Sequence, residues 1–149
     1  MKTFAFNKRA NYDYEILEKI EGGLVLKGYE VKSIKTGHIS LKGAFVTIKG
    51  NEAFLTNANI SAYQPLNMPA TYDPERSRKV LIRKSQIKSL IGKVKQKGLT
   101  LAPIKVYSKR GLIKLEFGIG KGKRKIDKRE DIKKREDKVK MKRMLRNKE

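Results

Sequence analysis

The segment from Lys121 to Glu149 limits how much of this chain can form a folded core. It holds 15 lysine or arginine residues against 6 aspartate or glutamate residues, a net charge of +9 in 29 residues. It has no proline and no glycine after Gly122, and its apolar residues are too sparse to form a stripe that packs on a core. We therefore divide the chain into a body, residues 1–120, which can bury a small core, and a basic C-terminal tail, residues 121–149.

Both parts of the chain are basic. The whole chain has a net charge of +22, so the body contributes +13 in addition to the +9 of the tail. A partner that contacts both parts is expected to be a polyanion, and nucleic acid is the commonest polyanion that basic proteins bind.

The composition argues against several classes of protein. The chain has no cysteine, so it can form neither a disulfide framework nor a thiolate metal site. No stretch approaches the roughly 20 apolar residues of a membrane-spanning helix, and the first nine residues lack the apolar run of a signal peptide. We expect a cytoplasmic protein that does not associate with membranes.

The spacing of apolar residues predicts a mainly β body with short helices. The predicted strands are residues 12–20, 24–26, 45–48, 53–55, 99–107 and 112–119, and the predicted helices are residues 30–36 and a helix capped by Ser85 and ended by Gly98. Several short strands joined by hairpins favour an OB-like β-barrel with flanking helices, because a barrel leaves no exposed sheet edge at this size.

Two details of this prediction concern the shape of the chain. The first strand alternates, so that one side is expected to carry Tyr14, Ile16, Glu18 and Ile20. A bulge is expected at Gly22-Gly23, where the strand bends. Residues 61–78 contain three prolines and almost no periodicity, which predicts a long loop.

Residues for catalysis are scarce. His38 is the only histidine, and nothing in the sequence places a nucleophile or a second metal ligand near it. The glycines at 118, 120 and 122 lack the spacing of a phosphate-binding loop, and we interpret them as flexible backbone before the tail. We expect neither enzymatic activity nor a cofactor, although an RNA-processing enzyme on a small barrel stays an alternative.

A basic cluster follows the long loop. It comprises Arg76-Ser77-Arg78-Lys79 and Arg83-Lys84, close in sequence to Tyr63 and Tyr72. Cations can hold an RNA backbone while tyrosine rings stack on its bases. A merely solvated basic face is the competing interpretation, and for a single lysine it is the better one.

An ordered set of short motifs resembles one known family. The motifs are Asn7-Lys8-Arg9-Ala10, Tyr14-Glu15-Ile16, Gly28-Tyr29-Glu30-Val31-Lys32-Ser33, Asp73-Pro74-x-Arg76-x-Arg78-Lys79 and Gly120-Lys121-Gly122-Lys123-x4-Lys128-Arg129. In this order and spacing they closely resemble the SsrA-binding protein family, also called SmpB. The resemblance covers the chain from Asn7 onward.

The resemblance implies an RNA-binding adaptor for trans-translation. Such a protein has an OB-like barrel that binds the tRNA-like domain of transfer-messenger RNA and delivers it to a stalled ribosome. Its tail, disordered in the free protein, becomes helical in the empty mRNA channel next to the small-subunit decoding region. We expect a monomer when free. The alternative is a structural ribosomal protein that binds ribosomal RNA permanently.

The resemblance and the basic cluster together give the expected site residues. Glu21, Leu81 and Lys114 match RNA-binding residues of the family, and the full expected RNA-binding set is Tyr12, Glu21, Lys32, Arg76, Arg78, Lys79, Leu81, Arg83, Lys114, Lys121 and Lys123. The expected ribosome-contacting residues of the tail are Asp127, Lys128, Arg129, Ile132, Lys133, Lys134 and Arg135.

Three positions depart from the family pattern. Tyr12 stands where the family usually has histidine, Arg83 where it often has asparagine or histidine, and Ile126 where it often has histidine or tyrosine. Tyr12 can still stack on a base, but Ile126 cannot replace a ring. Glu21 would be repelled by phosphate, so we expect it to accept hydrogen bonds from bases or ribose hydroxyls, or to orient neighbouring cations.

Overall fold

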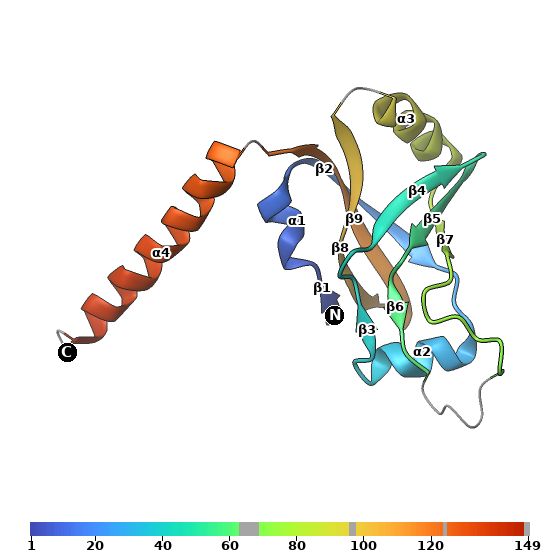
Figure 1. Ribbon diagram of the computed structural model, residues 1–149. Helices are drawn as coiled ribbons and strands as arrows, with labels where there is room; N and C mark the ends of the chain where they lie inside the picture. Colours follow the sequence, from blue (N-terminus) through green and yellow to red (C-terminus); the bar gives the residue numbers. More distant parts are fainter. Residues whose placement is uncertain (63–68, 96–97, 124, 148–149) are drawn as a thin grey trace.

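The computed structural model describes residues 1–62, 69–95, 98–123 and 125–147, and it shows a mainly β body with short helices and a long tail helix (Figure 1). The strands are β1 (Lys2–Phe6), β2 (Tyr14–Leu24), β3 (Ile39–Ser40), β4 (Phe45–Lys49), β5 (Glu52–Thr56), β6 (Asn59–Ile60), β7 (Arg78–Leu81), β8 (Leu99–Lys109) and β9 (Leu112–Gly122). The helices are α1 (Lys8–Asp13), α2 (Gly28–Lys35), α3 (Lys84–Val94) and α4 (Lys125–Asn147).

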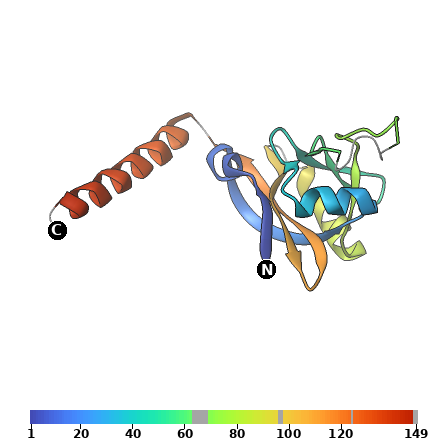
Figure 2. The same cartoon turned by 90° about the horizontal axis from the view of Figure 1, so that it is seen from below.

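Seven strands form one antiparallel sheet in the order β1-β8-β9-β2-β7-β5-β4, and β3 pairs with β6 separately. Among the described residues the edge strands β1 and β4 are not hydrogen-bonded to each other, so the pairing does not close the barrel that the sequence predicts. The sheet is nevertheless strongly curved, and β4 contacts β8 from the opposite half of the strand order (Figures 1 and 2). Only the mainly β architecture is therefore confirmed.

The two predicted hairpins are confirmed, and their turns explain why. β4 and β5 are joined through Gly50, which has a φ of +63°. β8 and β9 are joined by Arg110 and Gly111, with φ values of +52° and +77°. Two consecutive positive φ angles are typical of the type I′ turn, whose twist matches that of the flanking strands. The tight turn at Arg110-Gly111 sets the register between β8 and β9, which form the longest hairpin in the sheet.

The predicted single face of the first strand is wrong, because the bulge lies elsewhere. The register between β2 and β9 shifts between Ile16 and Glu18, not at Gly22-Gly23. Ile16 pairs with Gly120 and Ile20 pairs with Phe117, so the two isoleucines point to opposite faces. The extra residue of a bulge reverses the alternation that the sequence pattern assumes.

Glycines near the end of β9 make room for side chains of β2. A Cβ added at Gly118 would lie 2.8 Å from Ile16 Cγ2, and one at Gly120 would lie 2.8 Å from Tyr14 Cβ. Both distances are shorter than real Cβ contacts allow. These glycines are thus part of a paired strand that other side chains cross, and not the loose connection that the sequence suggested.

The helices agree with prediction in place but not in every boundary. α2 ends before Gly37, whose φ of +84° fits the predicted left-handed stop. α3 begins two residues earlier than expected, because Arg83 precedes it and donates its backbone N–H to Gln86 Oε1 at 3.1 Å. The sequence did not predict α1, which is only six residues long and buries Ala10 alone.

The core lies inside the curved sheet and is covered by α2 and α3. Its fully buried side chains come from β5, β7, β8 and β9 and from both helices; they include Ile34, Leu55, Val80, Leu90, Val106, Leu115 and Phe117. Ile113, Leu115, Phe117 and Ile119 are all buried, as the alternation in the last strand predicts. In the part of the chain that the structure describes, no helix is long and apolar enough to cross a bilayer.

A buried ion pair joins α2 to β7. Glu30 and Arg78 are both completely buried, and Arg78 donates to Glu30 Oε2 from Nε at 2.9 Å and from Nη2 at 2.7 Å. Arg78 Nη1 donates to the carbonyl of Ala58 at 2.8 Å. Arg76 binds the same carboxylate, and Tyr72 donates its hydroxyl to the carbonyl of Ile60 at 2.7 Å. We call Glu30, Tyr72, Arg76 and Arg78 the Glu30 cluster.

The Glu30 cluster keeps its charges in the folded state. Burial raises the pKa of Glu30, but hydrogen bonds from Arg76, the Lys27 backbone N–H and Arg78 lower it more, so the net shift is below the usual 4.5. A carboxylate with a depressed pKa stabilises the fold at pH values above its unfolded-state pKa.

We predict that Arg78→Ala lowers the free energy of unfolding by about 3–5 kcal/mol, because it leaves the Glu30 carboxylate buried with fewer partners. Urea denaturation followed by circular dichroism measures this change. Lys79→Ala is the matched control on the same strand: Lys79 makes an exposed 3.0 Å pair with Glu52, which contributes about 1 kcal/mol or less. Equal losses in the two variants would contradict the structural role of the cluster.

The same comparison has a pH dependence. The contribution of Glu30 is fully present above its unfolded-state pKa and is lost as the pH falls through the lower folded-state pKa. The stability difference between the wild type and Arg78→Ala should therefore shrink in acid, below a pH of about 4.5. A difference that stays constant from neutral pH into acid would mean that the ionised carboxylate is not what Arg78 stabilises.

Candidate RNA interface

Three of the expected RNA-binding residues lie together on the outer face of the sheet. Gly23 on β2 pairs with Leu81 on β7 on one side and with Lys114 on β9 on the other. Lys114 in turn pairs with Tyr107 on β8. Paired residues point to the same face of a sheet, so four adjacent strands present a row of Leu81, Gly23, Lys114 and Tyr107. Glu21 lies on the same face, two residues before Gly23. We call these five residues the outer-face row.

The place of a side chain at Gly23, in the middle of the row, is closely bordered by Leu81 and Lys114. A Cβ built at Gly23 would lie 3.8 Å from Leu81 Cβ and 3.8 Å from Lys114 Nζ. Leu81 is 55% exposed, which is unusual for a leucine in a central strand. An exposed apolar side chain beside the ammonium group of Lys114 suits the edge of a ribose or base together with its phosphate.

Glu21 is held in its charged form next to this place. The hydroxyl of Tyr107 donates to Glu21 Oε2, and Lys109 Nζ lies 3.4 Å from both carboxylate oxygens. The Tyr107 hydrogen bond lowers the pKa of Glu21 more than partial burial raises it, and the charges of Lys109 and Lys114 lower it further. Burial and the adjacent carboxylate raise the pKa of Tyr107, which therefore stays a donor. Glu21 can accept hydrogen bonds from RNA while it orients the lysines.

Tyr107 and Lys109 were not among the expected site residues, although the sequence contains the signal for Tyr107. A two-residue turn at Arg110-Gly111 places Tyr107 directly opposite Lys114. The predicted hairpin had a four-residue connection, Ser108 to Gly111, which gives a different register. Correct assignment of the turn type would have brought Tyr107 into the site.

The basic cluster of the sequence is divided by the fold. Arg78 is completely buried in the Glu30 cluster, so the structure does not place its guanidinium where RNA can reach it. The Arg76 side chain is 30% exposed but bound to Glu30. Lys79 is on the outer face and pairs with Glu52, and Arg83 is exposed just before α3. The physical reason is that a charged side chain with a buried acidic partner 48 residues away cannot be recognised as buried from local sequence.

Of the two tyrosines that lie near that cluster in the sequence, the structure describes only Tyr72. Tyr72 is half-buried and uses its hydroxyl on the carbonyl of Ile60, and its ring packs edge-on against Tyr29 at 5.3 Å. It holds the loop after residue 68 against α2 and is not the exposed stacking ring that was expected. Tyr63 lies outside the described residues.

Other expected residues lie away from the outer-face row. Lys32 is exposed on α2, and Lys121 is exposed near the end of β9. Lys123 donates its backbone N–H to the carbonyl of Asp13 at 3.0 Å, which joins the end of the body to α1. Tyr12 is half-buried in α1 and not in a strand, and the guanidinium carbons of Arg9 and Arg135 each lie 5.8 Å from its ring centroid.

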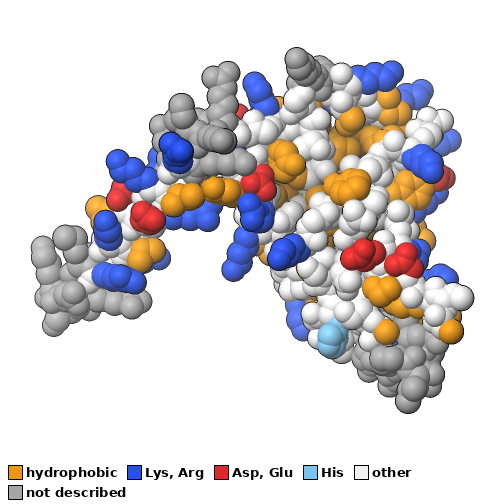
Figure 3. Space-filling view, in the orientation of Figure 1, with side chains coloured by type: hydrophobic (Ala, Val, Ile, Leu, Met, Phe, Trp, Pro, Cys, Tyr) orange, Lys and Arg blue, Asp and Glu red, His pale blue; other side chains and the backbone are white. Residues whose placement is uncertain are grey.

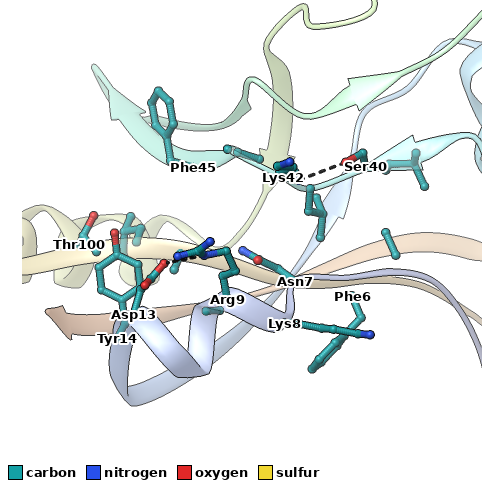
Figure 4. Close-up of a pocket in the computed structure, with 18 residues that line it drawn as sticks. Phe6, Asn7, Lys8, Arg9, Asp13, Tyr14, Ser40, Lys42, Phe45 and Thr100 are labelled. Atoms are coloured by element: carbon teal, nitrogen blue, oxygen red, sulfur yellow. Dashed lines mark hydrogen bonds and ion pairs between the residues drawn. The ribbon is translucent and has the colours of Figure 1, made fainter. Parts of the chain in front are cut away.

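A cleft of about 770 Å³ lies between α1 and the segment from β3 to β4. Figure 4 shows Asn7, Arg9 and Lys42 around it, with the Arg9 guanidinium directed at Asp13 at 3.5 Å. Lys8 also lines it. The cleft follows the seam where β1 and β4 do not pair, and its cations make it a second basic region of the body.

The tail residues form one basic helix. α4 contains all of the expected tail positions, and Arg129, Lys133, Lys134 and Arg135 are exposed, as is Ile132 at 40%. The side chains of Asp127 and Lys128 lie outside the described residues. Lys and Arg side chains project along the helix and from the nearest part of the body (Figure 3). Within the described part of the chain, no group of acidic or histidine side chains could hold a metal ion.

We predict that Tyr107→Phe raises the pKa of Glu21 toward 4.5, because the variant removes the largest cause of its depression. Lys109→Ala should raise the pKa by less, since its contacts are long at 3.4 Å. A pH titration of the Glu21 carboxyl carbon by NMR measures both shifts. An unchanged Glu21 pKa in Tyr107→Phe would show that the tyrosine does not hold the carboxylate.

Comparison with known proteins gives a consistent family. A family model described as SmpB protein matches residues 4–147. An SsrA-binding protein of Enterococcus faecalis is 47% identical over 146 residues, covering 98% of this chain and 94% of that protein. An SsrA-binding protein of Thermosipho africanus is 50% identical over 137 residues, covering 91% of each.

A solved structure is also similar. One chain of "tmRNA-SmpB: a journey to the center of the bacterial ribosome" matches with a TM-score of 0.66 and 43% identity, covering 85% of this chain and 92% of that chain. The residues matched by the family model include the outer-face row and the whole of the tail helix α4. The chain belongs to the SmpB family of SsrA-binding proteins.

Proposed function

We infer that this chain is an RNA-binding adaptor that binds the tRNA-like domain of transfer-messenger RNA and delivers it to stalled ribosomes for trans-translation. The observation that carries the proposal is the outer-face row, which brings Glu21, Leu81 and Lys114 from three strands onto one exposed surface. Membership of the SmpB family supplies the identity of the RNA. The protein contributes binding surfaces, and the ribosome contributes the chemistry, so we propose no enzymatic activity and no cofactor.

The row can recognise folded RNA without reading its sequence. Lys114 supplies a charge for a phosphate, and the exposed Leu81 beside Gly23 offers an apolar contact to a flat group. Glu21 accepts hydrogen bonds from ribose hydroxyls or exocyclic amines, and its preset orientation means that little entropy is lost on binding. Arg83 and Lys79 extend the positive surface along the same strand and the turn after it.

The OB-like description of the body belongs to this proposal. Its support is the curvature of the seven-stranded sheet and the contact of β4 with β8 across the open seam. In such a body the cations of the cleft, Lys8, Arg9 and Lys42, lie by the seam. An adaptor needs separate surfaces for its two partners, and the tail is the surface available for ribosomal RNA.

We propose that the tail enters the mRNA channel beside the small-subunit decoding region. Three acid-before-base pairs at i, i+4 add about 0.2–0.5 kcal/mol each to the helix. Fixing the backbone of each residue costs about 1–2 kcal/mol, and the exposed tail has no core to offset that cost. The free tail is therefore expected to be disordered or frayed, and the phosphate-lined channel stabilises the helical form.

The competing candidate is a structural ribosomal protein. It would also be basic and bind RNA, but it would be present at about one copy per ribosome. A rescue adaptor acts on the few ribosomes that stall, so its stoichiometry is far lower. We propose a cytoplasmic monomer, and the RNA that copurifies with it should be dominated by one species.

We predict that RNA binding is strongly salt-dependent and that Lys114 is central to it. Contact with about 6–10 phosphates would lower affinity by about 10³–10⁵ between about 50 and 200 mM salt. Lys114→Glu should weaken binding more than Lys114→Ala, because it adds repulsion to a lost contact. Gel-shift titration with the tRNA-like domain measures these effects. Lys49→Glu, in the β4–β5 hairpin, is the charge-matched control, and an equal loss there would mean that only net charge matters.

We predict that body and tail are separable. Truncation after Lys125 should preserve RNA binding and abolish peptide tagging on stalled ribosomes in a reconstituted translation reaction. Within the full chain, Lys128→Ala with Arg129→Ala should reduce tagging through lost contacts, and Ile132→Pro should reduce it by breaking the helix at unchanged charge. Normal tagging by the proline variant would show that the tail acts as a charged string and not as a helix.

A further inference from the structure

The described residues include two contacts that join the C-terminal tail to α1. The backbone N–H of Lys123 donates to the carbonyl of Asp13 at 3.0 Å, just before α4 begins. Farther along the helix, the Arg135 guanidinium lies over the Tyr12 ring, 5.8 Å from its centroid. From Lys125 to Arg135 the helix rises about 15 Å. One contact precedes the helix and the other lies about 15 Å along it, so together they define the direction of the docked helix as well as its origin.

These contacts join two parts of the chain that both carry a net positive charge. The body carries +13 and the tail +9, so the two parts repel each other unless a local feature compensates. Helix α1 supplies two such features. The electron-rich face of Tyr12 attracts a guanidinium, and the Asp13 carboxylate pairs with Arg9 at 3.5 Å, which reduces the repulsion between Arg9 and Arg135 over the same ring.

We propose that α1 is a docking site for the tail helix, with the Tyr12 ring as the receptor for Arg135, and that the docked tail covers a ring on which RNA would otherwise stack. Docking concerns the free protein and does not depend on the proposed function. The masking of Tyr12 rests on the proposed function, because it requires an RNA that competes for the ring.

The docked state is weak, as a reversible mask must be. An exposed cation–π contact shifts an equilibrium by about two- to fivefold, so the tail exchanges between docked and free forms, which agrees with a helix that is frayed in the free protein. Stacking of a base on an aromatic ring shifts its equilibrium by roughly fivefold or more. A base positioned by the rest of an RNA interface should therefore displace Arg135 and release the tail.

The absence of cysteine in the chain permits a direct test of docking. Lys138→Cys places a single nitroxide label on the exposed side of α4, about one turn beyond Arg135. In the free full-length protein, the label should broaden the backbone amide signals of α1. Adding Arg135→Ala should reduce this broadening, and adding Arg143→Ala, the same change two turns farther on, should leave it unchanged. Equal broadening in the Arg135→Ala and Arg143→Ala variants would overturn docking.

Two further variants distinguish the effect of the aromatic face of Tyr12 from the effect of the volume of its side chain. Tyr12→Phe keeps the aromatic face and should keep the broadening, whereas Tyr12→Leu removes the face and should reduce it. Because Tyr12 is half-buried in α1, the amide spectrum of each variant checks that the body is folded. The Arg135→Ala comparison decides the question by itself if Tyr12→Leu does not fold. Persistent broadening in a folded Tyr12→Leu variant would overturn the role of the ring.

Masking is tested by adding RNA. Saturation with the transcribed tRNA-like domain of transfer-messenger RNA should abolish the broadening of α1 by the label. Broadening that persists in the complex would overturn masking. Failure of this RNA to bind the unlabelled wild-type chain in a gel shift would overturn the proposed function and the masking with it, whereas docking is decided by the measurement on the free protein alone.

Discussion

The buried pair of Glu30 and Arg78 holds together the parts of the body that the local sequence does not connect. The two residues of this contact, Glu30 on α2 and Arg78 on β7, are 48 positions apart in the sequence, and the described residues 69–77 that lead into β7 belong to no helix or strand. Burying two charges is unfavourable unless nearly every polar atom finds a partner. Here the carboxylate receives hydrogen bonds from two arginines and a backbone N–H, and Arg78 also reaches Ala58. Such a network is geometrically demanding, so it specifies one arrangement of α2 against the sheet.

That arrangement positions the RNA interface. Arg78 begins β7, and Leu81 ends it, so the buried residue and the residue that we propose to contact RNA belong to the same short strand. β7 is paired with β2 at Gly23 and Leu24, and the Val25 backbone N–H donates to the carbonyl of Lys79 at 3.0 Å, which is a short contact for a strand that supplies part of the proposed site. Anchoring the start of β7 through Arg78 compensates for this. The buried Arg78 of the basic cluster therefore helps to hold in place the strand that carries the exposed Lys79 and Leu81.

The sequence predicted those parts of the fold that are governed by local signals. Both hairpins, α2 with its glycine stop and the apolar face of α3 follow from turn residues and periodicity over a few positions. The bulge at Leu17 could not be predicted, because Tyr14 to Ile20 alternates as a regular strand would. α1 was missed because its six residues are too few to show the 3.6-residue repeat of apolar positions in a helix. In addition, Tyr12 continues the alternating pattern of the strand that follows.

For the site, the family motifs identified the residues, and the fold decided which of them meet. Glu21, Leu81 and Lys114 were expected, but their proximity depends on pairings between strands that are distant in sequence. Arg78 was expected at the RNA surface because basic residues are usually exposed. Nothing local reveals that its partner is Glu30. Gly23 could not be recognised as a site residue, since its contribution is the space that a side chain would occupy.

The two-residue turn at Arg110-Gly111 has a consequence for how this protein can vary. Lys114 faces outward only because Ile113 and Leu115 face inward, and the turn sets both at once. An insertion or deletion of one residue there would move the lysine into the core and an isoleucine or leucine onto the RNA face. Any change that spoils recognition in this way also unfolds the body, so no folded but inactive protein would be produced by such a slip. Selection for stability thereby protects the register of the proposed RNA-binding surface, whereas the identity of Lys114 is protected only by selection for binding.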